Sequence, residues 1–169
     1  MRHSKYYLWT TPYIGAIICL IAFFTPSAFF ENIVWNHIIY NWIWGFYYER
    51  LPLGTITSRF YTNPLQLISS VLASIIIITC ILIILILNYK SRNELKKGII
   101  RPFTTILPSI LIIIATLIWM IMMEIAEFQL YNLSMWGRYF INFGVIGMFL
   151  GAGLTICGFF LIRKSLHIE

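Results

Sequence analysis

Two glutamates and an arginine carry the strongest chemical signal in this chain of 169 residues. Glu124 and Glu127 lie three positions apart near the end of a long apolar segment, so a helix brings both carboxylates to one face. Carboxylates at a membrane edge are typical of a proton or cation site, which here would consist of Glu124, Glu127 and Arg138. The alternative is structural ion pairing with Arg138, Arg59 or Arg50. We favour the pairing, because neither His nor Asp accompanies the glutamates in an apolar segment.

Other reactive side chains do not form a catalytic set. The three cysteines, Cys19, Cys80 and Cys157, fall inside apolar segments and form no C-x-x-C motif. The sequence also contains no nucleophile–base pair, no cluster of metal ligands and no phosphate-binding loop. We therefore expect a protein that is not an enzyme and that needs neither a cofactor nor a metal.

Small residues form a stripe along the last apolar segment. Close backbone approach between helices in lipid depends on small side chains, so this stripe predicts a helix-packing interface. The interface lies either between subunits or inside the chain's own helix bundle, and the sequence favours the second. The stripe consists of Gly144, Gly147, Gly151, Thr155 and Gly158.

Aromatic residues are concentrated between the first two apolar segments, at 31–63. They predict either a protein-contact surface or an aromatic belt that anchors the chain at the membrane surface. The segment fits an interfacial amphipathic helix, but its Ile, Val, Trp and Tyr content fits strands equally well, with a turn at 51–54 and a strand at 55–60. The candidate contact residues are Trp35, Trp42, Trp44, Tyr47 and Tyr48.

Composition identifies the elements that must position these residues. Hydrophobic residues make up 60% of the chain and charged residues 11%, whereas a soluble domain has about 25% charged residues. This excludes a soluble globular domain and predicts an all-α membrane protein, a single four-span domain over 1–169. Its four-helix transmembrane bundle carries an outer loop at 31–63, either a small extracellular sheet or an interfacial helix, and a cytoplasmic loop at 88–101. The expected spans are 12–30, 64–87, 102–130 and 135–162.

Polar residues just before two of these spans predict where the helices begin. Asn63 directly precedes the second span, and Ser134 directly precedes the fourth. Both residue types are favoured at helix N-caps, so we expect each to cap its helix.

Basic residues predict how the chain is oriented. Nine Lys and Arg residues lie at the termini and in the loop at 88–101, whereas only Arg50, Arg59 and Arg138 lie on the other side. Because basic residues stay inside, both termini are expected in the cytoplasm, in the plasma membrane of the cell. This asymmetry accounts for the net charge of +6, so no nucleic-acid partner is needed. The expected partners are the lipid bilayer and other membrane-protein subunits or further copies of the chain.

The layout resembles the claudin and peripheral-myelin-protein type of tetraspan. Trp35 after the first span, Trp44-Gly45 further on and Arg59 near the second span are similar to conserved features of that family, although the loop lacks its pair of cysteines. The resemblance implies that the first outer loop forms a small sheet on a third helix that protrudes from the membrane.

These observations together lead to an expected function. We expect a non-catalytic multi-pass membrane protein that acts through protein–protein contacts, as a structural subunit of a membrane complex or as a self-associating tetraspan. The alternative is a small transporter or channel that uses Glu124, Glu127 and Arg138.

Overall fold

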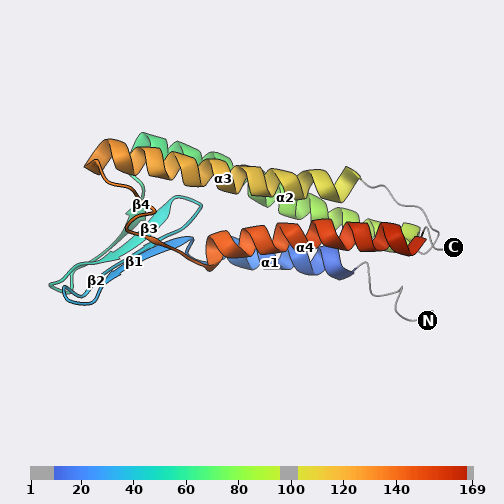
Figure 1. The fold of residues 1–169 in the computed structure, drawn as a ribbon, viewed down its shortest axis with the longest axis horizontal. Coiled ribbons are helices and arrows are strands. Elements are labelled where there is room, and N and C mark those ends of the chain that lie inside the picture. Colours follow the sequence, from blue (N-terminus) through green and yellow to red (C-terminus); the bar gives the residue numbers. More distant parts are fainter. Residues whose placement is uncertain (1–9, 96–102, 167–169) are drawn as a thin grey trace.

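The computed structural model describes residues 10–95 and 103–166, which are mostly helical. Within these residues, four helices are joined to one five-stranded sheet at a single end of the molecule (Figure 1). The helices are α1 (Thr10–Phe24), α2 (Pro64–Leu95), α3 (Phe103–Tyr131) and α4 (Phe143–Leu166). The strands are β1 (Ala28–Asn32), β2 (His37–Asn41), β3 (Phe46–Arg50), β4 (Ile56–Phe60) and β5 (Phe140–Ile141).

Three of these helices, α2, α3 and α4, are long and apolar enough to cross a membrane. The length and composition of these helices therefore suit a membrane-embedded protein. Helix α1 is apolar, and its described part has 15 residues, about 22 Å at 1.5 Å per residue, against a hydrocarbon core of about 30 Å. The predicted end of the span at 12–30 is wrong, because the helix stops at Phe24. Pro26 explains the early stop, since the residue before a proline is disfavoured in the helical conformation.

The other helix boundaries also differ from the prediction. Helix α2 continues to Leu95, so the expected loop at 88–101 begins later, and residues 96–102 lie outside the described residues. Helix α4 begins at Phe143 rather than at residue 135, because residues 140–141 pair with β1 as the fifth strand. Several basic residues behind the predicted orientation also lie outside the described residues, namely Arg2, Lys5, Lys96, Lys97 and Arg101.

The N-caps show why two of these helices begin where they do. Asn63 caps α2, as predicted, because its Oδ1 accepts the Leu65 N–H at 2.8 Å. Ser134 does not cap α4, and its Oγ accepts the Gly137 N–H in the preceding loop instead. Asn142 takes that place, with its Oδ1 accepting the N–H of Phe143 at 2.7 Å.

The helices pack mainly as two pairs, α1 with α4 and α2 with α3. The glycine stripe of α4 lies against α1: a Cβ added at Gly151 would stand 2.5 Å from Cys19 Sγ and from the Gly15 carbonyl. At Gly147 it would stand 2.6 Å from Ala22 Cβ. The stripe thus packs within the chain's own bundle. In the other pair, fully buried Trp119 on α3 donates from Nε1 to Ser70 Oγ on α2 at 2.9 Å.

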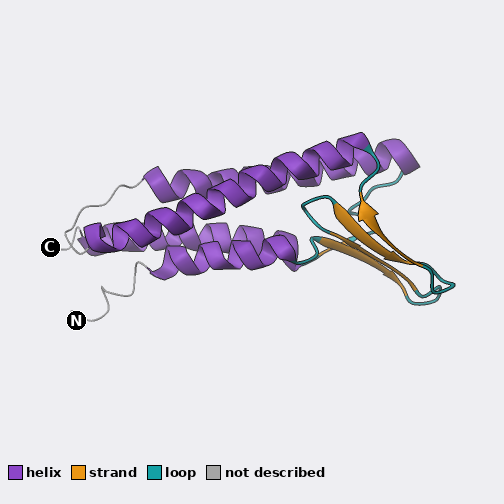
Figure 2. Ribbon diagram, turned by 180° about the vertical axis from the view of Figure 1, so that it is seen from behind, coloured by secondary structure: helices purple, strands orange, loops and turns teal. Residues whose placement is uncertain are grey.

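The segment at 31–63 folds as strands, which decides between the two structures that its sequence allowed. The antiparallel sheet has the order β4-β3-β2-β1-β5, and β4 begins at Ile56, close to the predicted strand at 55–60 (Figure 2). Connectors of three residues or fewer join α1 to β1, β4 to α2 and β5 to α4. The sheet is therefore tied closely to both helix pairs.

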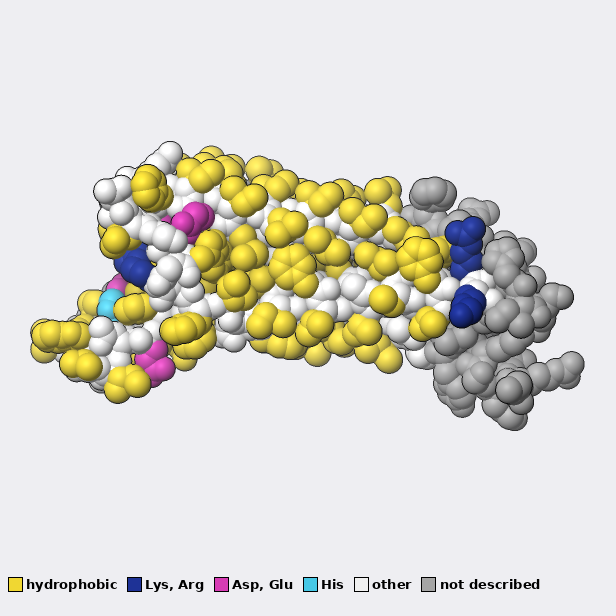
Figure 3. All heavy atoms as spheres, viewed as in Figure 1, with side chains coloured by type: hydrophobic (Ala, Val, Ile, Leu, Met, Phe, Trp, Pro, Cys, Tyr) yellow, Lys and Arg dark blue, Asp and Glu magenta, His cyan; other side chains and the backbone are white. Residues whose placement is uncertain are grey.

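The surface separates into an uncharged belt and polar ends. On the face drawn in Figure 3, hydrophobic side chains run along the length of the helices, and the acidic side chains and the histidine that are described there lie toward the sheet. Described basic residues Arg163 and Lys164 lie in the last turn of α4, at the opposite end. This distribution suits a bilayer around the middle of the helices.

Candidate functional site

One face of the sheet carries a continuous row of aromatic rings. Strand pairing places Phe29 opposite Tyr40 and Tyr40 opposite Tyr48, with ring centroids 6.4 Å and 6.2 Å apart. Every neighbouring pair lies within the range at which aromatic rings attract each other. We call this row the outer aromatic face; its members are Phe29, Tyr40, Trp42, Trp44, Phe46, Tyr48, Phe60 and Phe140.

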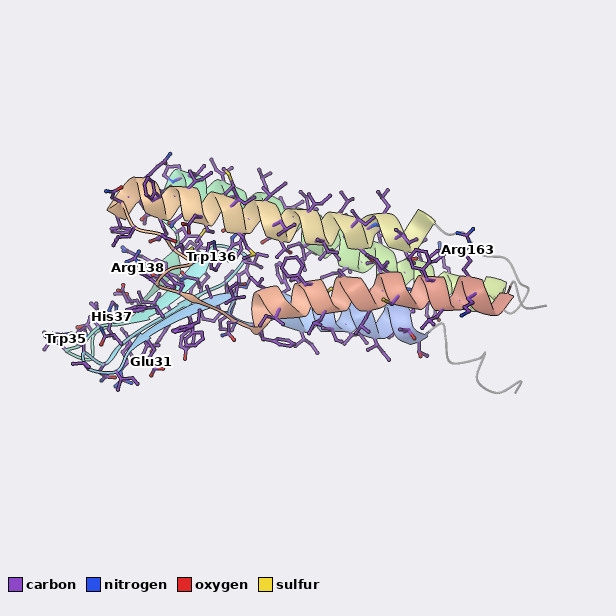
Figure 4. The ribbon with its side chains drawn as sticks, in the orientation of Figure 1. Glu31, Trp35, His37, Trp136, Arg138 and Arg163 are labelled. Atoms are coloured by element: carbon purple, nitrogen blue, oxygen red, sulfur yellow. The ribbon has the colours of Figure 1, made fainter. Side chains whose placement is uncertain are left out.

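The outer aromatic face includes three of the five predicted contact residues, namely Trp42, Trp44 and Tyr48. Tyr47 lies on the opposite face, because successive strand residues alternate in direction. Trp35 lies at the tip of the β1–β2 hairpin, 65% exposed beside the still more exposed Ile33 and Val34 (Figure 4).

The opposite, inner face of the sheet forms a cleft of about 580 Å³ against the ends of α2 and α3. The strands contribute mostly polar side chains to the cleft. Helix α2 contributes the amide of Gln66, helix α3 the carboxylate of Glu127, and the loop before β5 the guanidinium of Arg138. These residues include Asn41, Tyr47, Glu49, Arg59, Tyr61, Gln66, Glu127, Tyr131, Arg138 and Tyr139.

Glu127 forms the centre of the polar wall of this cleft. It is 9% exposed. Its Oε2 accepts a hydrogen bond from Arg138 at 2.8 Å, and its Oε1 accepts one from Gln66 Nε2 at 3.0 Å. The Arg138 guanidinium also lies 5.7 Å from the ring centroids of both Tyr131 and Tyr139, between α3 and the sheet (Figure 4). Of the three arginines considered, the structure pairs Glu127 with Arg138.

Glu124 has a different environment from Glu127, although the two share a helix. Its Oε2 accepts the backbone N–H of Trp136 at 3.1 Å, and Trp136 Nε1 donates in turn to the Met120 carbonyl at 3.2 Å. Glu124 is only partly buried. It therefore holds the loop after α3 against the helix and is not part of the Arg138 pair.

Two tyrosines, buried Tyr61 and partly buried Tyr139, complete the interior of the cleft. Tyr61 donates from its hydroxyl to Asn41 Oδ1 at 3.0 Å and stacks on Tyr47 with ring centroids 6.0 Å apart. Burial raises the pKa of Tyr61 well above its ordinary value, and Tyr139 and Glu127 raise it further. Burial and the charge of Glu127 likewise raise the pKa of Tyr139 to about 12. Both phenols thus stay protonated, as neutral hydrogen-bond donors.

The outer part of the cleft brings together an acid and a base that do not pair with each other. Glu49 accepts hydrogen bonds from His37 Nε2 at 2.9 Å and from Thr57 Oγ1 at 3.4 Å. Arg59 is exposed, donates from Nε to the Tyr47 hydroxyl and lies over the Tyr47 ring at 5.3 Å.

Sequence reasoning missed most of this cleft. Asn41, Tyr47, Glu49 and Arg59 come to one face only because the β2–β3 and β3–β4 registers place them at matching positions. The polar residues at 47, 49 and 59 are evident in the sequence. They indicate a shared face only once the segment is known to form strands. In residues 10–95 and 103–166, no three metal-ligating side chains gather in one place.

Comparison with known proteins gives no relative from which a role could be transferred. No protein-family model matches the chain, and a search of curated proteins finds no significant match.

Proposed function

We propose that the chain is a four-span membrane protein of claudin-like architecture that acts through protein–protein contacts, without catalysis. In this proposal α1 joins the three long helices as a fourth span, both termini lie in the cytoplasm, and the sheet lies outside the plasma membrane. The protein serves either as a structural subunit of a membrane complex or as a unit that associates with itself.

The sheet supports the architectural part of the proposal. Four of its strands come from the loop between α1 and α2, and the fifth comes from the segment between α3 and α4. The residues that line the cleft come from the inner face of this sheet and from the end of α3, so the two face each other. A small sheet on a protruding third helix is the arrangement that the family resemblance implied.

The outer aromatic face is the observation that carries the contact function. Phe60 is 56% exposed and Phe140 62% exposed, and the rings between them are partly exposed. Strands alternate, so this face is directed away from the cleft on the other side of the sheet. Aromatic residues are enriched at the centres of protein interfaces, and a continuous exposed patch of them marks an interaction site.

The experiment is to extract the full chain in a mild detergent and to measure the mass of the complex, identifying every chain that co-purifies. We expect a complex of fixed stoichiometry, either with other subunits or with further copies of the chain. Phe60→Ser and Phe140→Ser should release the chain from that complex. Tyr89→Ser is the matched control, because Tyr89 is 76% exposed on α2, outside the sheet. A wild-type chain that remains a lone species would refute the contact function.

Transport through Glu124, Glu127 and Arg138 is the alternative. Gln66 and Arg138 occupy both carboxylate oxygens of Glu127, which favours a structural role for this group. The alternative has its own test, since ion flux into vesicles containing the purified chain should then be abolished by Glu127→Gln.

A further inference from the structure

We propose that the cleft between the inner face of the sheet and the ends of α2 and α3 binds a phosphate group, with Arg59 as its principal ligand. The phosphate belongs either to a phospholipid headgroup or to a small soluble phosphate. This inference is independent of the contact function, which uses the other face of the sheet.

The cleft is lined by two carboxylates and two guanidinium groups, and Arg59 is the one of these four whose charge has no ion-pair partner among the described residues. Both carboxylates are already bound by the protein's own donors: Glu127 by Gln66 and Arg138, and Glu49 by His37 and Thr57. Among the described residues, the Arg59 guanidinium forms no ion pair. A guanidinium has five N–H donors, and Nε is the one that Arg59 gives to Tyr47, so the terminal N–H groups can bind a planar or tetrahedral anion.

The Arg59 side chain is also held in place before any ligand arrives. The Tyr47 hydroxyl accepts its Nε–H, and the guanidinium lies 5.3 Å from the centroid of the same ring. Tyr47 is in turn stacked on buried Tyr61, with an angle of 9° between the ring planes. An arginine fixed on an aromatic stack loses less conformational freedom when it binds a ligand.

The height of the cleft suits a lipid headgroup. On the sheet side, α2 and α3 extend further than α1 and α4 (Figure 1). A sheet edge has unpaired backbone groups and so does not occur in hydrocarbon, which places the membrane boundary no further out than the start of the sheet. The cleft lies between the sheet and the extended ends of α2 and α3, and is therefore at or just outside headgroup level. It also includes apolar Ile39 and Leu130, against which the glycerol end of a lipid would pack.

The test measures binding of short-chain phosphatidylglycerol to the full chain purified in an alkyl maltoside, by native mass spectrometry and by titration. We expect one saturable site, and Arg59→Gln should weaken binding about tenfold or more, as loss of a charge-assisted hydrogen bond predicts. Arg50→Gln is the matched control, because Arg50 is an exposed arginine on the neighbouring strand that does not line the cleft. Arg59→Lys should retain part of the affinity, and Tyr47→Phe, which leaves the charge in place, should reduce it.

Competition identifies the source of the phosphate. If inorganic phosphate displaces the lipid at a similar concentration, the cleft takes a soluble phosphate; if it does not, the cleft takes a headgroup. The proposal is overturned if Arg59→Gln and Arg50→Gln bind the lipid equally well. It is also overturned if a maltoside without phosphate occupies the same site with equal affinity. Circular dichroism of each variant shows that a loss of binding does not reflect a loss of fold.

Discussion

Gly151→Ala should destabilise the packing of α1 against α4, whereas Gly153→Ala should stabilise the protein. A Cβ at Gly151 would stand 2.5 Å from the Gly15 carbonyl and 2.8 Å from the Cys19 amide nitrogen. These are backbone atoms and cannot rotate away, so the two helices must move apart. A Cβ at Gly153 would meet nothing within 4 Å.

The magnitude follows from the displacement that this clash requires. Relief of the contact at Gly151 moves the helices apart by roughly 0.5–1 Å, a gap that forfeits a quarter to a half of each dispersion contact across the interface. Overpacking of this kind costs about 1–3 kcal/mol. Alanine gains roughly 0.5–1 kcal/mol over glycine in a helix. The net effect at Gly151 is therefore a loss of up to about 2.5 kcal/mol. Gly153→Ala has no such cost and retains only the gain in helix propensity.

Unfolding in mixed detergent micelles, followed by far-UV circular dichroism, measures this difference in free energy. The alkylation rate of Cys19 provides a local readout, because this thiol is fully buried where α1 meets α4. Gly151→Ala should accelerate alkylation of Cys19, and Gly153→Ala should not. If both variants were stabilised equally, the close approach of the two backbones would not exist and the packing argument would fail.

Two further predictions concern the cleft. Arg138→Gln should lower the free energy of unfolding by about 1–3 kcal/mol, because it leaves the carboxylate of Glu127 buried beside Gln66 alone; Arg50→Gln, at an exposed site, serves as the control, and equal stability of the two variants would contradict the structural pairing. The stability should also fall as pH rises from about 10 toward 12, because folded Tyr139 keeps its proton up to a pKa of about 12 while the unfolded chain releases it near 10.0. Denaturation of the parent and of Tyr139→Phe at a series of pH values measures how much of this pH dependence comes from Tyr139. If the free energy of unfolding of the variant falls with pH as steeply as that of the parent, Tyr139 makes no contribution.

Much of the helical architecture was accessible from the sequence, because long apolar runs have few alternatives in a membrane. The strong N-cap at Asn63 was also predicted correctly. The first and last spans were both predicted too long, because Pro26 ends α1 early and strand pairing delays the start of α4. Residues 28–29 and 140–141 are apolar enough to extend a helix, but they pair with each other in β1 and β5 instead. Pairing between segments more than 100 positions apart leaves no local signature.

The candidate site was accessible only in part. The sequence placed Glu127 near three arginines, but the choice of Arg138 depends on the path of the loop after α3, which Glu124 fixes through Trp136. In the segment at 31–63 the periodicity slightly favours a helix and the composition favours strands, so the two faces of the sheet could not be separated beforehand. Tyr47 and Tyr48 were therefore assigned to one surface, although the strand directs them to opposite sides.

The short connectors between the sheet and the helices have a mechanical consequence. Three helices enter or leave the sheet through at most three residues, and they belong to both helix pairs. A force applied to one edge of the sheet is therefore transmitted to the other strands through their backbone hydrogen bonds, and so to the helices joined to them. At the opposite end of the bundle, within the described residues, no sheet spans the two pairs. A partner bound to the sheet would thus act on the spacing of the helices at that end, whereas the sheet itself places no restraint on their far ends.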